Sequence, residues 1–116
     1  MKLWIDDVRP APEGYTWCKS VNEAKFLLIR VEAHNTVAKD FNNNFNDDYT
    51  IYEIELIDID HDAGDYASDG GDYIKLLDWL EETGRNYPIR IHSMNPVGVA
   101  NMRAIIQRNG WKEVLR

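Results

Sequence analysis

Acidic and histidine side chains are concentrated in three short segments of the sequence, and their types suit metal and phosphate chemistry. These segments are Asp6-Asp7, Asp60-His61-Asp62 and His92-Ser93-Met94-Asn95. Carboxylate oxygens are ligands that suit Mg²⁺ or Mn²⁺, and a histidine nearby favours Mn²⁺ or another transition metal. We therefore expect a site for a divalent metal, Mg²⁺ or Mn²⁺, whose ligands are Asp6, Asp7, Asp60 and Asp62.

Other polar residues near these segments have side chains that can bind or protonate a phosphorylated small molecule. His61 and His92 can act as general acid or base near neutral pH. Arg9 can contact phosphate oxygens in a bidentate way. A predicted helix begins after Asn95, and its free N–H groups and positive dipole end favour an anion. Asn95 is first a helix cap and second a ligand contact, whereas Asn101, one turn on, faces either the site or solvent.

A calcium-binding EF-hand is an alternative interpretation of the central acidic segment. Asp58, Asp60 and Asp62 alternate as the ligands of that loop do, and Asp69 takes the twelfth place. The sixth place is Ala63, where the EF-hand requires glycine, and the preceding residues are typical of a strand. We therefore reject the EF-hand.

Apolar runs bounded by turn residues predict the elements that position these side chains. Strands are expected at Lys2–Ile5, Tyr15–Cys18, Ile51–Ile59 and Ile89–Ile91. Helices are expected from the S-x-x-E capping box at Ser20–Glu23, over Asp72–Glu82, and from Pro96 to Asn109, where Gly110 ends the last one.

Two segments give weaker signals. His34–Asp48 is polar and crowded with asparagine, and it predicts a loop or a frayed extension of the helix before it, which we take as a surface insertion at about residues 34–50. Trp111–Leu115 predicts a short tail or an edge strand.

Alternating strands and helices predict an α/β domain with a mostly parallel sheet covered on both faces. Ligands of such sheets bind beyond the carboxyl ends of the strands. All three polar segments follow predicted strands directly, so we expect them to meet at this one edge of the sheet.

Length and charge narrow the class of protein. A chain of 116 residues predicts one domain over residues 1–116. Its net charge of −7 argues against binding to a nucleic acid polymer or a membrane surface. The lone Cys18 cannot form an internal disulfide, and the sequence has no signal peptide or membrane span, so we expect a cytoplasmic protein.

Three motifs in this order resemble the family of cyclic-phosphate processing receiver domains. They are LWIDDVRPAP, IDIDHDAG with the following GGDYIKLLDWL, and IHSMNPVGVANM, which are similar to the family patterns DDxRxxP, LDHDLG and HSxNPxGxxNM. The resemblance covers nearly the whole chain except about residues 34–50. It implies a receiver-like (flavodoxin-like) three-layer sandwich with a mostly parallel sheet of four or five strands.

The resemblance also implies roles for individual residues. Asp6 and Asp7 would hold Mg²⁺, Asp60 would be the phosphoryl-accepting aspartate of a receiver, and Ser93 would supply the hydroxyl after the next strand. The sequence departs from ordinary receivers at several points. The receiver lysine has no clear counterpart, since Lys112 lies in the tail, the first crossover helix is replaced by a loop, and His61 and His92 are additions.

Two functions from different classes fit these residues. The first is a metal-dependent phosphoesterase, acting on a cyclic or nucleotide-like phosphate, with Asp60, His61 and His92 as catalytic residues and Arg9, Ser93, Asn95 and Asn101 as substrate contacts. The second is a non-catalytic receiver-like signalling module, which accepts phosphoryl on Asp60 or binds a phosphorylated ligand or a protein partner.

Overall fold

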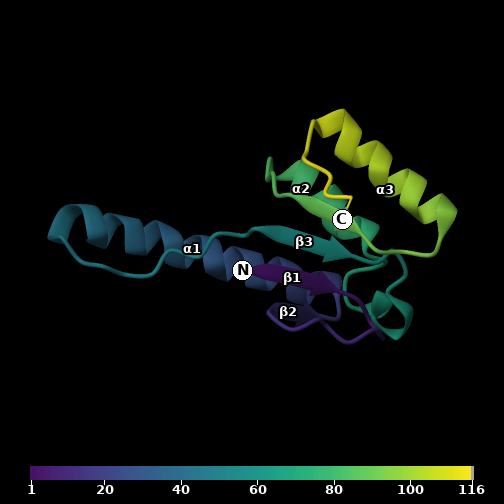
Figure 1. The fold of residues 1–116 in the computed structure, drawn as a ribbon, viewed down its shortest axis with the longest axis horizontal. Coiled ribbons are helices and arrows are strands. Elements are labelled where there is room, and N and C mark those ends of the chain that lie inside the picture. The colour runs from purple at the N-terminus through teal and green to yellow at the C-terminus, as the bar shows by residue number, and fades with distance from the viewer. Residues whose placement is uncertain (116) are drawn as a thin grey trace.

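A parallel sheet brings the polar strand ends of the chain to one edge. The computed structural model describes residues 1–115. Its four strands are β1 (Lys2–Ile5), β2 (Tyr15–Cys18), β3 (Leu56–Ile59) and β4 (Ile89–Ile91), in the order β2-β1-β3-β4 and all parallel (Figure 1). This order is that of the first four strands of flavodoxin-like folds. The predicted α/β fold with a parallel sheet is confirmed.

Within residues 1–115, three α-helices and one short 3₁₀ helix accompany the sheet. They are α1 (Val21–Phe45), the 3₁₀ helix η1 (Gly64–Ser68), α2 (Ile74–Glu82) and α3 (Pro96–Asn109). The Ser20 hydroxyl accepts a hydrogen bond from the Glu23 N–H at 3.0 Å, so the predicted cap of α1 is confirmed. No helix within residues 1–115 is long and apolar enough to cross a membrane.

The core lies between one face of the sheet and the helices α1, α2 and α3. Successive side chains of a strand point to opposite faces, and the parallel register aligns Leu3 with Ile57 and Ile5 with Ile59. These four side chains are fully buried in one cluster with α1 and α2. Helix α3 packs against α2. Helix α1 lies in the connection from β2 to β3, α2 in that from β3 to β4, and α3 in that from β4 to the bridge at Glu113. All three connections run in the same direction across the sheet, and right-handed crossovers therefore place the helices on one face.

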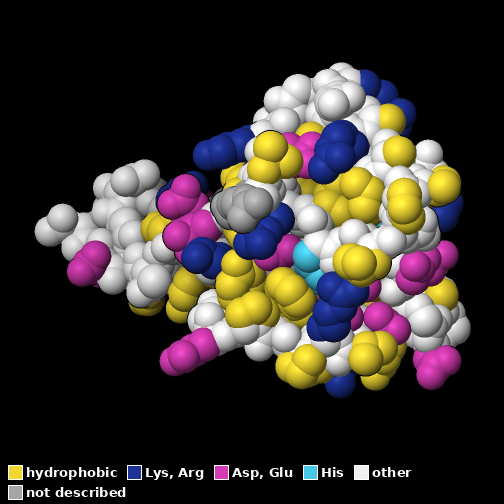
Figure 2. Space-filling view, turned by 45° about the vertical axis from the view of Figure 1, so that its right-hand side comes forward, with side chains coloured by type: hydrophobic (Ala, Val, Ile, Leu, Met, Phe, Trp, Pro, Cys, Tyr) yellow, Lys and Arg dark blue, Asp and Glu magenta, His cyan; other side chains and the backbone are white. Residues whose placement is uncertain are grey.

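The opposite face of the sheet differs from the expected three-layer arrangement within the described residues. The β1-to-β2 connection runs in the other direction across the sheet, and it is a loop where a second layer of helix would begin. Side chains of Trp4, Tyr15 and Trp17 lie on this face, half-buried. Figure 2 shows hydrophobic side chains at the surface around a histidine, with basic side chains beside them.

Tryptophan N–H groups fix the loop that replaces the missing helix. Trp4 Nε1 donates to the carbonyl of Arg9 at 2.8 Å, and Trp17 Nε1 donates to the carbonyl of Asp6 at 2.7 Å. Both indoles stand on the strands that the loop connects. The loop is therefore held over the carboxyl edge of the sheet.

Helix α1 is longer, and β3 shorter, than their expected bounds. Residues 34–45 continue α1, so of the two predicted alternatives the helix extension is the one observed, and Asn46 ends it with a left-handed backbone (φ 56°). The strand expected at residues 51–59 begins only at Leu56. Its neighbour β1 begins at Lys2, so residues 51–54 have no strand beside them, and the Glu55 N–H bonds the carbonyl of Met1 at 2.9 Å.

Residues 34–55, which we call the arm, are held together by asparagine side chains. Asn35 donates to the carbonyl of Tyr52 at 2.7 Å and accepts from its N–H at 2.9 Å. Asn42, two helical turns further along α1, makes the same pair of bonds with Tyr49 at 3.0 and 2.7 Å. The return segment is thus tied to the helix by side chains that imitate strand pairing, and it projects with α1 from the sheet (Figure 1).

The C-terminal segment beyond α3 meets the free edge of β4. Glu113 forms one parallel bridge with Ile89, and the Val114 N–H donates to the Ile89 carbonyl at 2.7 Å. This matches the expected short tail or edge strand, with a single bridge in place of a full strand.

Removing the Asn35 amide should loosen the return segment of the arm without unfolding the core. Asn35→Ala loses both bonds to Tyr52, each contributing about 0.5–1.5 kcal/mol net, so hydrogen exchange at the Tyr52 amide should speed up roughly tenfold or more. The Ile57 amide in β3 should exchange as in wild type. Asn44→Ala, a change at an exposed position of the same helix, is the matched control. Unchanged exchange at Tyr52 would contradict this account of the arm.

Candidate functional site

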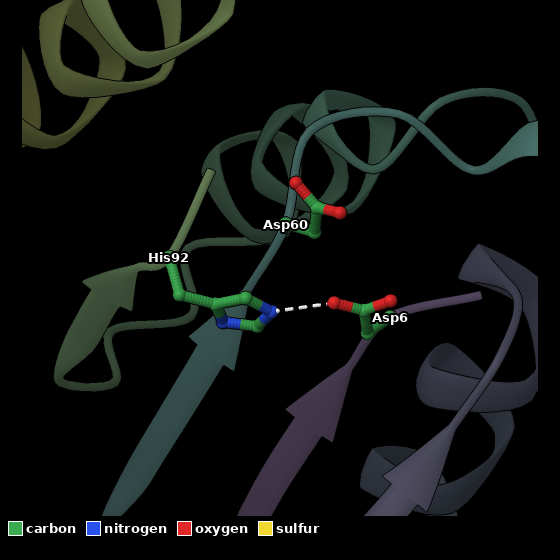
Figure 3. A group of neighbouring side chains, drawn as sticks. All are labelled: Asp6, Asp60 and His92. Atoms are coloured by element: carbon green, nitrogen blue, oxygen red, sulfur yellow. Dashed lines mark hydrogen bonds and ion pairs between the residues drawn. The ribbon is translucent and has the colours of Figure 1, made fainter. Parts of the chain in front are cut away.

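Three side chains from three strand ends converge at the carboxyl edge of the sheet. Asp6 follows β1, Asp60 follows β3 and His92 follows β4. The backbone keeps its sheet pairing one residue beyond the strands, since the Asp60 N–H bonds the Ile5 carbonyl and the His92 N–H bonds the Ile59 carbonyl, both at 2.9 Å. Each of the three residues offers a ligand atom, and these atoms lie within 4.8 Å of one another (Figure 3).

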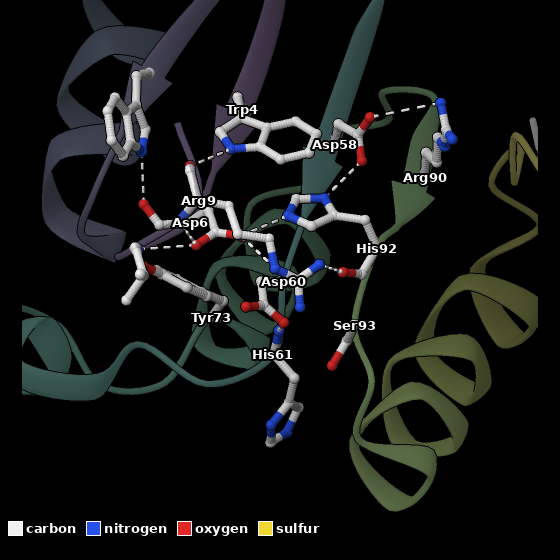
Figure 4. A network of polar contacts seen from close by, with 12 residues as sticks. Trp4, Asp6, Arg9, Asp58, Asp60, His61, Tyr73, Arg90, His92 and Ser93 are labelled. Atoms are coloured by element: carbon white, nitrogen blue, oxygen red, sulfur yellow. Dashed lines mark hydrogen bonds and ion pairs between the residues drawn. The ribbon is translucent and has the colours of Figure 1, made fainter. Parts of the chain in front are cut away.

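The ring of His92 lies between two buried carboxylates. Its Nε2 is 2.9 Å from Asp6 Oδ2 and its Nδ1 is 2.7 Å from Asp58 Oδ1 (Figure 4). Both aspartates are 1% exposed. The indole of Trp4 stacks on the imidazole with centroids 3.8 Å apart and planes at 4°. A neutral imidazole carries one N–H, so only the doubly protonated ring can donate to both carboxylates at once.

Asp6 joins the loop after β1 to this histidine. Its Oδ1 accepts the N–H groups of Val8 and Arg9, both at 2.9 Å, and this Asx turn shapes the loop. Burial would raise the pKa of the Asp6 carboxyl, but these two bonds and the contact with His92 hold it below its ordinary value. The carboxylate therefore stays ionised, with one oxygen for the loop and the other for His92.

Asp7 borders the group of three but is not part of it. Burial raises the pKa of its carboxyl, and the negative charges of Asp6, Asp60 and Asp62 raise it further. A Cβ at Gly64 would come within 2.3 Å of Asp7 Oδ2, and the glycine has φ +55°, so this position suits glycine alone. The carboxylates around Asp7 thus form a local excess of negative charge that a cation would relieve.

His61 points away from the Asp6–His92 pair and toward α3 (Figure 4). Its Nδ1 lies 2.9 Å from the exposed Asp62 carboxylate, and its ring packs on Gly98 in the first turn of α3. Asn95 Oδ1 accepts the Gly98 N–H at 3.0 Å and so caps the helix, as predicted. His61 therefore links the loop after β3 to α3, and Asp62 is its partner outside the group of three.

The other residues predicted to contact the substrate lie around this edge of the sheet and differ in their exposure to solvent. Arg9 is half exposed, with its Nη1 3.2 Å from the carbonyl of His92 and its Nε 4.0 Å from Asp6 Oδ2. Ser93 Oγ accepts the Asn95 N–H at 3.1 Å, which shapes the turn into α3. Asn101 is exposed on α3.

Asp58 and Trp4 are the residues of this arrangement that the sequence analysis did not assign to the site. Asp58 lies inside β3, on the strand face opposite Ile57 and Ile59, and Trp4 is its register partner in β1. The available signal was an aspartate inside an otherwise apolar buried strand, two residues before Asp60 and therefore on the same face.

The contact between His61 and Gly98 predicts that Gly98→Ala changes the free energy of unfolding in opposite directions in the presence and in the absence of the His61 ring. In Gly98→Ala the new Cβ would lie 2.4 Å from His61 Cγ, so overpacking should destabilise the fold by about 1–3 kcal/mol. With His61→Ala in the background, the ring is absent and alanine should stabilise the helix by about 0.5–1 kcal/mol. Urea unfolding of the four proteins measures both values. Equal destabilisation in both backgrounds would show that the ring is not the constraint.

Comparison with known proteins assigns the chain to a family. Residues 1–108 match the family model of the cyclic-phosphate processing receiver domain, a span that contains all four strands and every residue of the site. No curated protein and no solved structure matches the chain. The predicted family and the receiver-like fold are confirmed. The chain therefore belongs to the cyclic-phosphate processing receiver domain family.

Proposed function

We propose that this chain is a metal-dependent phosphoesterase that acts on a cyclic or nucleotide-like phosphate. The observation that carries the proposal is the convergence of Asp6, Asp60 and His92 within 4.8 Å at the carboxyl edge of the sheet. In a parallel α/β sheet this edge is where ligands bind. The family's description as processing cyclic phosphates supports the substrate class.

The three side chains fit a divalent cation by the chemistry of their donor atoms. Two carboxylates and one imidazole suit Mn²⁺ or another transition metal better than Mg²⁺, which prefers oxygen alone. Asp7 and Asp62 are further candidate ligands, since both carry negative charge beside Asp60. A cation held there would polarise a phosphoryl oxygen as a Lewis acid.

The protein side chains supply the other functions that phosphoester cleavage requires. The half-exposed guanidinium of Arg9 can bind two phosphate oxygens in a bidentate way. The Nε2 atom of His92 faces the group of three. It can serve there either as a metal ligand or, when it carries a proton, as the donor to the departing oxygen, because one nitrogen cannot do both. The Ser93 hydroxyl and the capped first turn of α3 border the same edge, as neutral hydrogen-bonding groups for the substrate.

The receiver-like module remains the second candidate because of where Asp60 and Ser93 lie. Asp60 follows the central strand β3 and is only partly buried, and Ser93 follows the adjacent β4. These are the places where a receiver carries its phosphoryl acceptor and its hydroxyl. Against it, His92, which bonds the Asp6 carboxylate, is an addition to the receiver pattern, and phosphoryl acceptance by Asp60 has no use for a proton donor there.

Metal binding should raise the melting temperature through the three converging residues. A cation at about 100 times its dissociation constant stabilises the folded state by about 2.7 kcal/mol, several degrees for a domain of this size. Millimolar Mn²⁺ should produce such a shift in wild type and in Asp65→Asn, whose side chain lies outside the group, and little shift in Asp60→Asn. The measurement is thermal unfolding with and without the metal. A wild-type melting temperature that neither Mn²⁺ nor Mg²⁺ moves would remove the metal from the proposal.

Turnover of cyclic phosphates should depend on His92 and Asp60. With Mn²⁺ or Mg²⁺, wild type should hydrolyse at least one member of a panel of cyclic phosphate compounds. His92→Ala should lower turnover by ~10²- to 10⁴-fold, the usual contribution of a general acid, and Asp60→Asn should abolish it. His34→Ala, in the arm, is the control histidine. Stable labelling of wild type, but not of Asp60→Asn, by acetyl phosphate with no turnover of any compound would favour the signalling module.

A further inference from the structure

We propose that Asp58 is a positioning residue, which fixes the ring of His92 so that Nε2 faces Asp6 and Asp60. Its value for catalysis rests on the proposed function. The positioning itself is a property of the folded chain and is tested without turnover.

The position of Asp58 makes it a rigid support for His92. It lies in the middle of β3, paired in register with Trp4 of β1 and with Arg90 of β4. His92 stands two residues after Arg90, so the bond of 2.7 Å between Asp58 Oδ1 and His92 Nδ1 crosses diagonally between neighbouring strands. Supports built on strands hold a side chain more closely than supports on loops do.

Packing alone gives no reason for a carboxylate at this position. Asp58 is 1% exposed, and its neighbours in the strand are the apolar residues Leu56, Ile57 and Ile59. Aspartate is unfavourable in strands, and a buried carboxylate costs free energy unless it is paired. Arg90 is a distant partner, with Nη1 3.8 Å from Asp58 Oδ2, whereas His92 is a close one. The close contact indicates what the carboxylate is for.

The orientation of the ring follows from two contacts together. Asp58 Oδ1 lies 2.7 Å from Nδ1, which directs Nε2 at the edge of the sheet, and the stacked Trp4 covers one face of the ring. Turning the ring by half a turn would replace both nitrogens by carbons and break the bonds to Asp58 and Asp6 together. A carboxylate behind a histidine serves both roles open to Nε2, since it orients a metal ligand and also holds a proton donor in place.

The test compares Asp58→Ala and the isosteric Asp58→Asn with Arg90→Ala. Asparagine keeps an acceptor oxygen for Nδ1–H, alanine removes it, and Arg90→Ala leaves Asp58 and His92 intact while removing the ion pair. Two-bond ¹H–¹⁵N NMR of the metal-free protein at one pH reports which ring nitrogens of His92 carry protons. Titration with Mn²⁺ alone reports the affinity, and thermal unfolding reports the fold.

The positioning role predicts a specific pattern. Wild type, Asp58→Asn and Arg90→Ala should show a His92 Nδ1–H protected from exchange with water, and Asp58→Ala should lose it. The Mn²⁺ dissociation constant should rise about 10- to 100-fold in Asp58→Ala and less in Asp58→Asn, as for other residues that orient metal ligands. An unchanged His92 signal in Asp58→Ala would overturn the proposal, and so would its loss in Arg90→Ala to the same degree. If wild type binds no Mn²⁺, the proposed function loses its metal, while the NMR comparison still decides the role of Asp58.

Discussion

The pairing of His92 with Asp6 and Asp58 is the interaction on which the site depends. Two carboxylates that are 1% exposed would each cost several kcal/mol if they were left without a partner. One imidazole, stacked on Trp4, lies within hydrogen-bond distance of both carboxylates, with Nδ1 at Asp58 and Nε2 at Asp6. Because the three residues come from β1, β3 and β4, the same pairing also ties the carboxyl ends of three strands together.

The loop that replaces the first crossover helix follows from this pairing. Asp6 bonds His92 with one oxygen and the N–H groups of Val8 and Arg9 with the other, so the chain turns at once after β1. The indoles of Trp4 and Trp17 then hold the loop by its carbonyls. The result is a sheet face covered by aromatic side chains in place of a helix, and an arginine held over the edge where the strands end.

Sequence patterns predicted the parts of the fold that depend on residues close together in the chain. The strands β1, β2 and β4 lie between turn residues, and the caps at Ser20 and Asn95 form as their sequences indicate. The end of α1 and the start of β3 depend on contacts between distant residues. Asn35 and Asn42 bond Tyr52 and Tyr49 across the arm, and no nearby pattern marks these pairs. A polar, asparagine-rich segment therefore predicted a loop as readily as the helix that is observed.

The same division applies to the site. Topology alone placed Asp6, Asp60 and His92 at one edge, because parallel strands end together. It could not reveal that Asp58 lies against His92, since that contact depends on the register between β3 and β4, nor that His61 turns toward α3, where Gly98 leaves room for its ring. Asp6 is consequently the residue whose replacement is hardest to interpret, because its carboxylate shapes the loop, contacts the ring of His92 and offers a metal ligand at once. Within residues 1–115 the Asp60 carboxylate makes a single hydrogen bond, from the His61 N–H at 2.7 Å, so its replacement separates metal binding from the architecture of the loop.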